Sequence, residues 1–551
     1  MIFRLQIYRL SPEYKMAWFL MISVAVLSLQ PVTGIAQLSQ PARFELTHDD
    51  GDHLFTIVSL QENGISMIRQ KEKSEGSKKL WEIFLLDTAL QQTWNRQVAL
   101  DNRFTLVGYD YIPGELFFLF RHGESNQGDL HLMRIYLLNH TIQEFDITPK
   151  LDFKLTHFIV VGNSAVLGGY VARQSTALLF EMESSHLKVI PGFFINNTEL
   201  LEVKANRNRT FNVLLIERGV REKKHLLLKT FDESGSLLLE DDIEVDPDKT
   251  ILAGTTSTLV NDELFLAGTW AQGSGKQSAG FFSALVDPFN KQPIRYYDFG
   301  ELQHFFDYMS PKRATKIKSR ADRRRQELKP PFYRADVHIV KMEESAKGFL
   351  LLAELFIPAM NSSYPPYYNN NPYYTNSPGY YSPYGFNPMM MNRYNNSPYY
   401  NSPNSNYNPP YGSSNRNTDV SIIHSSLVIF DQQGKLKEDF GIALEDVKLQ
   451  TLDQVTDFYA SEKFIQFYKK EKEIYAATNW ADGNASEQDT LKISLKSAND
   501  VVRNESGDLG GVRYWFGRYA YAWGYETIKN KTQQTGSQVR YVYYVNKIKM
   551  E

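Results

Sequence analysis

The chain has 551 residues, and its 60 basic side chains nearly balance its 63 acidic ones. This balance gives no electrostatic reason to expect nucleic acid as a partner. The chain contains no cysteine, which excludes disulfide bonds, thiolate metal sites and cysteine nucleophiles. Its length and its 42% hydrophobic composition suffice for several small domains or for one large repeat fold.

The N-terminus has the layout of an export signal. Basic side chains precede an apolar run, Met16–Leu29, that is shorter than the ~20 residues needed to cross a bilayer. Gly34 and Ala36 then supply small residues at a cleavage site. We expect residues 1–36 to be a signal peptide, with a retained signal anchor as the alternative. The mature chain is then exported, and is periplasmic, outer-membrane-associated or extracellular.

One strand-turn-strand unit serves as the template for most of the chain. Within Leu228–Val245, an apolar strand ends at Phe231, the chain turns from Asp232 to Gly235, and a second strand follows. Asp caps such a turn through its own backbone, and Gly accepts positive φ. The same Phe-Asp-x-x-Gly-x-Leu unit occurs at residues 430–436. We interpret it as the outer hairpin of a β-propeller blade.

Similar hairpins recur at a regular distance along the chain. Successive turn residues are 44 to 55 positions apart, and a period near 50 with four short strands is typical of propeller blades. The corresponding turn residues are Asp87, Asn139, Glu183, Asp232 and Asp287.

Two weaker copies, ending at Lys496 and Val545, bring the count to eight blades, or to seven if they form one irregular blade. The segment Arg43–Thr47 is a strand that precedes the first full unit. We expect it to complete the last blade, because this closure removes the open sheet edges of a linear array. The prediction is an all-β fold, a closed propeller of seven or preferably eight four-stranded blades over residues 37–551.

The repeat spacing breaks once, between Asp287 and Asp431, where two insertions are expected in one blade. Residues 311–329 carry nine basic and two acidic side chains and are predicted to form a short helix. Residues 361–418 are rich in Tyr, Asn, Pro and Ser and are predicted to be disordered. Both are candidate interaction segments, with a solvated helix and a neutral spacer as the alternatives. The candidate partner-binding residues are Arg320, Arg323, Arg324, Arg325, Tyr373, Tyr374, Tyr399 and Tyr400.

The C-terminal stretch is unusually aromatic. Tyr519, Tyr521, Trp523 and Tyr525 lie on one face of a predicted strand, and small residues lie on the other. We expect core packing between blades, with the small face allowing close approach. An aromatic platform for a sugar or a peptide at the propeller mouth is the alternative.

The sequence contains no strong catalytic motif, and the segment Gly273–Lys276 is expected to be a hairpin loop rather than a phosphate-binding loop. The residues His48, Asp50, Asp52 and His53 are possible ligands of a divalent metal ion. A hydrated turn between two strands explains them equally well. We therefore expect no metal and no cofactor.

With its two Phe-Asp-x-x-Gly-x-Leu hairpins and its C-terminal strands 519–525 and 541–548, the chain resembles secreted bacterial β-propeller proteins common in the Bacteroidetes. The resemblance implies a fold and no catalytic residue. We expect a monomeric, non-enzymatic binding or scaffold protein of the periplasm or cell surface, whose partner is a protein or glycan of the cell envelope. The alternative is a carbohydrate-active lyase or hydrolase with its site at the channel mouth.

Overall fold

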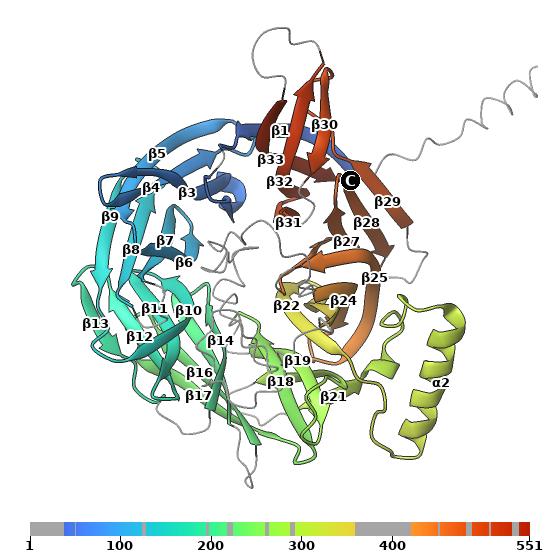
Figure 1. Ribbon diagram of the computed structural model, residues 1–551. Helices are drawn as coiled ribbons and strands as arrows, with labels where there is room; N and C mark the ends of the chain where they lie inside the picture. Colours follow the sequence, from blue (N-terminus) through green and yellow to red (C-terminus); the bar gives the residue numbers. More distant parts are fainter. Residues whose placement is uncertain are drawn as a thin grey trace, which may run out of the picture.

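The sheets of this protein are arranged radially in a closed ring, as an eight-bladed β-propeller (Figure 1). The eight-blade count confirms the preferred prediction. The structure is a computed structural model that describes residues 38–49, 51–123, 128–193, 198–217, 224–258, 264–286, 293–358, 420–449, 452–480, 487–505, 509–531 and 539–551. The expected signal peptide and the Tyr/Asn/Pro/Ser-rich insertion lie outside these residues.

In the first four blades, four antiparallel strands follow one another in chain order. Blade 1 contains β2 (Thr56–Ser59), β3 (Ile65–Glu75), β4 (Lys78–Leu86) and β5 (Gln92–Asp101). Blade 2 contains β6 (Phe104–Ile112), β7 (Glu115–His122), β8 (Leu130–Tyr136) and β9 (Ile142–Ile147). Blade 3 contains β10 (Phe153–Val161), β11 (Ser164–Val171), β12 (Gln174–Glu181) and β13 (His186–Val189). Blade 4 contains β14 (Thr198–Ala205), β15 (Thr210–Glu217), β16 (Lys224–Asp232) and β17 (Leu237–Val245).

Blades 5 to 7 repeat this order, and blade 8 departs from it. Blade 5 contains β18 (Lys249–Thr256), β19 (Leu264–Gln272), β20 (Gly280–Val286) and β21 (Arg295–Asp298). Blade 6 contains β22 (Asp336–Ser345), β23 (Gly348–Ile357), β24 (Val420–Phe430) and β25 (Leu436–Leu449). Blade 7 contains β26 (Thr456–Ala460), β27 (Lys463–Lys470), β28 (Glu473–Trp480) and β29 (Glu487–Lys492). Blade 8 contains β30 (Asp500–Glu505), β31 (Gly511–Phe516), β32 (Tyr519–Asn530), β33 (Val539–Met550) and β1 (Leu38–Thr47).

The predicted template hairpin joins the third and fourth strands of blade 4, as expected. One carboxylate oxygen of Asp232 accepts hydrogen bonds from the backbone amides of Ser234 and Ser236, at 2.8 and 2.9 Å. Gly235 has a φ of +75°, which favours glycine. Asp431 caps the corresponding hairpin of blade 6 in the same way. Local turn chemistry therefore marks this position of the repeat.

The N-terminal strand closes the ring. β1 is longer than the expected Arg43–Thr47 and pairs antiparallel with β33, with Arg43 opposite Asn546. In Figure 1 the blue N-terminal strand accordingly lies beside the red C-terminal strands. The two weak hairpin copies were misplaced, because Asn546 lies inside β33 and Lys496 lies in the connection between β29 and β30. Blade 8 needs no hairpin there, since the other end of the chain supplies its outer strand.

Each adjacent pair of blades shares a buried apolar cluster. On β32, Tyr521, Trp523 and Tyr525 pack against blade 1. Ala520 and Ala522, on the opposite face, pack against blade 7. The alternation confirms the prediction of inter-blade packing with a small face toward one neighbour.

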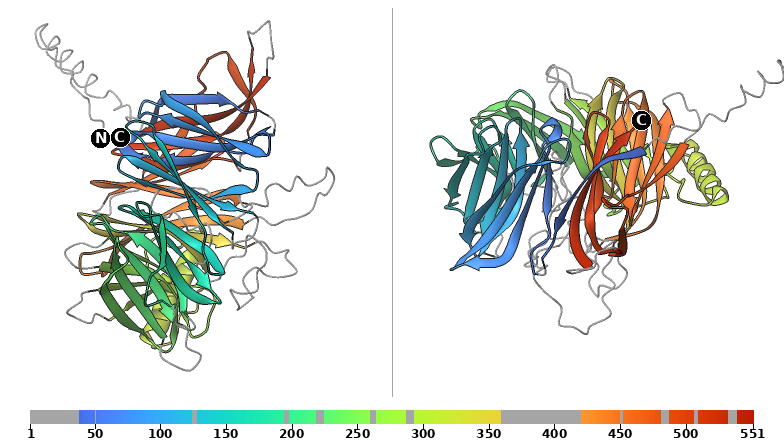
Figure 2. Two further views of the ribbon diagram at one scale, coloured as in Figure 1. Left: turned by 90° about the vertical axis from the view of Figure 1, so that its left-hand side faces the viewer. Right: turned by 90° about the horizontal axis from the view of Figure 1, so that it is seen from above.

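The basic insertion contains the one α-helix of the described residues, α2 (Pro311–Gln326), which confirms the predicted helix. It lies at the rim of the propeller (Figures 1 and 2). The placement of both insertions in one blade was wrong: α2 lies in the connection between β21 and β22, and residues 361–418 fall inside blade 6, between β23 and β24. The short β21, of four residues, hid the end of blade 5 in the sequence.

Short 3-10 helices complete the described secondary structure: η1 (Gln61–Asn63) in blade 1 and η2 (Phe299–Glu301) after β21. Across the ranges that the structure describes, no helix has both the length and the apolar character required to cross a membrane.

Candidate functional site

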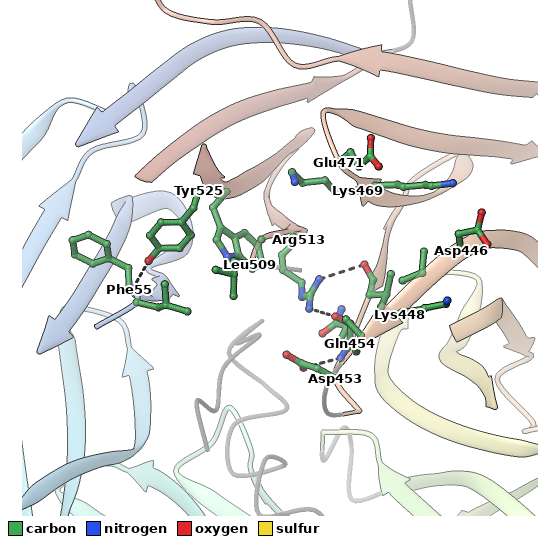
Figure 3. Close-up of a pocket in the computed structure, with 18 residues that line it drawn as sticks. Phe55, Asp446, Lys448, Asp453, Gln454, Lys469, Glu471, Leu509, Arg513 and Tyr525 are labelled. Carbon is green, nitrogen blue, oxygen red and sulfur yellow. Dashed lines mark hydrogen bonds between the residues drawn. The ribbon is translucent and has the colours of Figure 1, made fainter. Parts of the chain in front are cut away.

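A cavity of about 340 Å³, here called the mouth pocket, opens at one end of the propeller. Blades 6, 7, 8 and 1 supply its walls. The wall segments are the residues before β2, the end of β25 with its connection to β26, the turn between β27 and β28, and the start of β31 together with β32 (Figure 3).

Strand order explains why these distant segments meet. Each blade is antiparallel, so the turn between its second and third strands lies at the same end as its connection to the next blade. The turn 469–471 and the connection 453–455 are such segments. A pocket at this end is therefore assembled from several blades.

Two buried side chains, one a guanidinium and the other a carboxyl group, hold the connection before β26 in place. Arg513 donates to the carbonyl oxygens of Gln454 and, at 3.4 Å, of Val455 (Figure 3). Glu354 accepts from the amides of Val455 and Thr456, at 2.9 and 2.6 Å. Because the carbonyls and the amides of one short segment are both bound, this wall of the mouth pocket is preorganised.

Arg513 also has an unused donor. Its side chain is buried, and its Nε atom has no hydrogen-bond partner within the described part of the chain. A buried donor without a partner costs about 1–3 kcal/mol. An acceptor that reached this atom would remove that cost.

Asp453 supplies a carboxyl group on the connection before β26, the segment that Arg513 and Glu354 hold in place. Its side chain lines the mouth pocket, and its carboxylate accepts the amide of Gln454 at 2.7 Å. Burial raises the pKa of Asp453 to about 6, although the nearby Arg513 guanidinium opposes this shift. Near pH 6 this carboxyl can therefore either accept or donate a hydrogen bond to a ligand.

Positive side chains outnumber negative ones around the mouth pocket. The exposed carboxylates, Asp446 and Glu471, lie on a strand end and a turn. The four cationic lining residues are Lys448, Lys469, Lys470 and Arg513.

The aromatic residues of the mouth pocket form a wall rather than an open platform. Phe55, Trp523 and Tyr525 line it but are at most 4% exposed, because they also form the core between blades 8 and 1. The hydroxyl of Tyr525 accepts from the amide of Phe55 at 2.5 Å, which joins the two blades at the pocket. The exposed polar groups therefore decide which ligand can bind.

A second recess, of about 1000 Å³, lies at the opposite end of the propeller. Hairpin tips of blades 2, 3 and 4 line it, and an ion pair between Glu115 and Arg134, at 2.8 Å, forms one side. Other lining residues, such as Glu183, Arg207 and Arg209, are exposed to solvent. This recess is less enclosed than the mouth pocket.

Two of the residues considered as metal ligands, His48 and Asp52, instead contact an arginine of the protein itself. Atom Nη1 of the buried Arg69 lies 3.2 Å from both Asp52 Oδ2 and His48 Nδ1. Burial lowers the pKa of both His48 and His53. Asp50 lies outside the described residues. No group of three or more His, Asp or Glu residues within the described ranges is placed to hold a metal ion.

The candidate partner-binding arginines divide into two sets on α2. Arg320 and Arg323 are exposed. Arg324 donates to the carbonyl of Pro330 at 2.8 Å, and Arg325 pairs with Asp298 at 3.4 Å, so both are used within the protein. The four candidate tyrosines, Tyr373, Tyr374, Tyr399 and Tyr400, lie outside the described residues.

Comparison with protein-family models and with curated proteins gives no match. Among solved structures, the chain is similar to the β-propeller domain of the trilobed protease from Pyrococcus furiosus, with 8% identity, 82% of this chain and 96% of that chain covered, and a TM-score of 0.32. It is also similar to the polysaccharide lyase Uly1 (7% identity, 81% and 90% covered, TM-score 0.36). A third is prolyl oligopeptidase B from Galerina marginata (7% identity, 96% and 61% covered, TM-score 0.37). These structural neighbours are distant, and scores this low do not bear on the ligand of this protein.

Proposed function

We propose that this protein is an exported, non-enzymatic binding protein of the cell envelope, of the secreted Bacteroidetes type that its hairpins resemble. We further propose that its mouth pocket binds a small acidic, hydroxyl-bearing molecule such as a sugar acid. The observation that carries this proposal is the excess of cationic side chains around a preorganised carboxyl, Asp453.

The size and lining of the mouth pocket support this class of ligand. A cavity of about 340 Å³ lies at the lower end of the ~300–1,000 Å³ range of small-molecule sites. Lys448 and Lys470 can pair with the acid group of a ligand, and Asp453 can bind a ligand hydroxyl. The buried aromatic wall limits the space for a larger apolar group.

The proposal is tested by titrating glucuronate, and glucose as the neutral comparison, into the full mature protein. We expect glucuronate to bind and glucose to bind much more weakly. Lys448→Gln combined with Lys470→Gln should reduce glucuronate affinity about tenfold or more, because each lysine offers a charge-assisted hydrogen bond.

The matched control removes two exposed lysines from the turn before β25 and the start of that strand, at the other end of the propeller: Lys435→Gln combined with Lys437→Gln. This control should bind glucuronate like the unmodified protein. Equal binding of glucose and glucuronate, or an equal loss in both double variants, would contradict the proposed site.

A carbohydrate-active lyase or hydrolase is the second candidate function, and the raised pKa of Asp453 favours it. A carboxyl that titrates near pH 6 can serve as a general acid or base. Incubation with oligouronates, followed by detection of new reducing ends or unsaturated sugars, separates the two functions. Turnover that Asp453→Asn abolishes without loss of binding would favour the enzyme, and intact oligouronates favour the binding protein.

A further inference from the structure

The outward face of α2 carries a row of cations that form no ion pair within the described part of the chain. We define the cationic stripe as Lys312, Lys316, Arg320 and Arg323, all of which are exposed. Their spacing of four, four and three residues places them on one side of a helix. With a rise of ~1.5 Å per residue, the row is about 16 Å long.

The other face of α2 is fixed to the propeller. Ala321 is buried, and Ala314 and Ile317 are half-buried in the cluster between blades 5 and 6. A Cβ atom on Gly300 would lie 2.4 Å from the Cβ of Ala321, so helix and loop are in close contact. The cationic stripe is therefore held rigidly and points away from the body of the protein.

Several other cations on and beside α2 already have partners within the protein. Arg325 pairs with Asp298 at 3.4 Å and contacts Glu301 at 3.7 Å. Lys318 donates to the carbonyl of Gln303. By contrast, no member of the cationic stripe forms an ion pair with any described residue, and Arg320 lies 4.3 Å over the ring of Phe332.

This arrangement costs the helix stability. Like charges at i and i+4, as in Lys312, Lys316 and Arg320, repel each other and destabilise a helix. Within α2 the single acid, Asp322, pairs with Arg325 rather than with the stripe. An external polyanion would relieve this repulsion and would gain a preordered row of positive charge.

We propose that the cationic stripe binds a linear acidic polysaccharide. The helix lies at the rim of the propeller (Figures 1 and 2). Charge complementarity and the single narrow row of cations favour a chain that lies along this helix. An anionic membrane is less well matched, because the apolar face of α2 is covered by the propeller. Beside the helix, Leu328 is 94% exposed, and one such side chain gives little membrane anchoring. This proposal does not depend on the mouth pocket, whose lining residues lie outside α2.

The test uses the full mature protein and labelled polygalacturonate, with neutral dextran as the comparison polymer. We expect polygalacturonate to bind at low salt, and the binding to weaken as salt shortens the range of the charges. The stripe variant should lose roughly tenfold or more in affinity, since four exposed ion pairs are removed together. Its substitutions are Lys312→Gln, Lys316→Gln, Arg320→Gln and Arg323→Gln.

A matched control removes two lysines and two arginines that are exposed on other blades, and should keep its affinity within about threefold. The stripe variant should also melt no lower than the unmodified protein, because its like-charge repulsion is gone. The double variant of the mouth pocket, Lys448→Gln with Lys470→Gln, should bind the polymer normally, so that failure of one site is distinguishable from failure of the other. The control substitutions are Lys73→Gln, Arg96→Gln, Lys492→Gln and Arg503→Gln.

Three results would overturn the proposal. One is unchanged binding of polygalacturonate by the stripe variant at its full melting temperature. Another is an equal loss in the stripe variant and the matched control, which would indicate general charge alone. The third is binding to phosphatidylglycerol vesicles, lost in the stripe variant, without any binding of polygalacturonate, because this would assign the stripe to a membrane surface.

Discussion

Replacing Glu354 by glutamine changes the pH dependence of stability in a way that the structure specifies. Glu354 is fully buried, and burial raises its pKa from 4.5 to about 7. One carboxylate oxygen accepts three hydrogen bonds, from the amides of Val455 and Thr456 and from the Thr456 hydroxyl. A glutamine oxygen can accept the same three bonds but cannot ionise.

The direction and the size of this change in the free energy of unfolding follow from the linkage between proton binding and folding. In the unfolded chain Glu354 ionises near pH 4.5, whereas in the folded protein it stays protonated until about pH 7. Its contribution to stability is therefore complete below pH 4.5 and is lost as the pH rises to 7. The loss is about 3 kcal/mol, from ~1.4 kcal/mol for each unit of pKa difference. Glu354→Gln should gain this amount relative to the unmodified protein between pH 4.5 and pH 8.

Urea denaturation of both proteins at a series of pH values and constant ionic strength measures this difference. In the variant, the side-chain amide nitrogen takes the place of Glu354 Oε2, an atom that has no hydrogen-bond partner among the described residues. The unpaired amide lowers the stability of the variant by an amount that does not vary with pH. The slope of the difference, rather than its absolute value, is thus the diagnostic quantity. A difference that stays constant from pH 4.5 to 8 would refute the reasoning. Glu462→Gln, at an exposed turn, is the control and should parallel the unmodified protein.

Three further predictions concern stability. Removing residues 38–47 should lower the free energy of unfolding by about 5 kcal/mol or more, because the ladder bonds of β1 to β33 are lost at ~1 kcal/mol each; a truncated chain that melts like the intact one contradicts closure. Gly300→Val should cost about 1–3 kcal/mol and reduce helical circular dichroism, because its side chain meets Ala321; an unchanged spectrum and melting temperature would show that α2 is not held there. Burial lowers the pKa of His424 to about 4. The contribution of this neutral histidine to the free energy of unfolding is therefore complete above pH 6.5, and about 3 kcal/mol of it is lost as the pH falls to 4. His424→Leu should remove this acid loss from denaturation curves, and equal acid sensitivity in both proteins would count against it.

Much of the fold could be predicted because its signals are local. The carboxylates of Asp232 and Asp431 cap their own turns, so the residues that make the hairpin are adjacent in the sequence. The closing strand could be predicted because the sequence contains one strand before the first four-stranded unit. The last blade was less visible, since its outer strand comes from the other terminus and no turn marks it. The four-residue β21 was missed for the related reason that it leaves little periodicity.

The mouth pocket could not be predicted from the sequence, because its contacts are long-range. Arg513 meets Gln454 across 59 residues, and Glu354 meets Val455 across 101. No spacing rule links these positions, since insertions and turns of different length separate them. Asp453 carried no motif, and its raised pKa arises only from folding. The basic helix was visible in composition, but the division between its inward and outward arginines required the packing of Ala321.

Amide hydrogen exchange of the full mature protein, with and without glucuronate, tests the central claim most directly. We expect glucuronate to slow exchange in residues 453–455 and 469–471, which line the mouth pocket, and to leave the hairpin tips at the opposite end unchanged. Protection confined to those opposite hairpins, or unchanged exchange in both wall segments at saturating glucuronate, would contradict the assignment of the mouth pocket as the binding site.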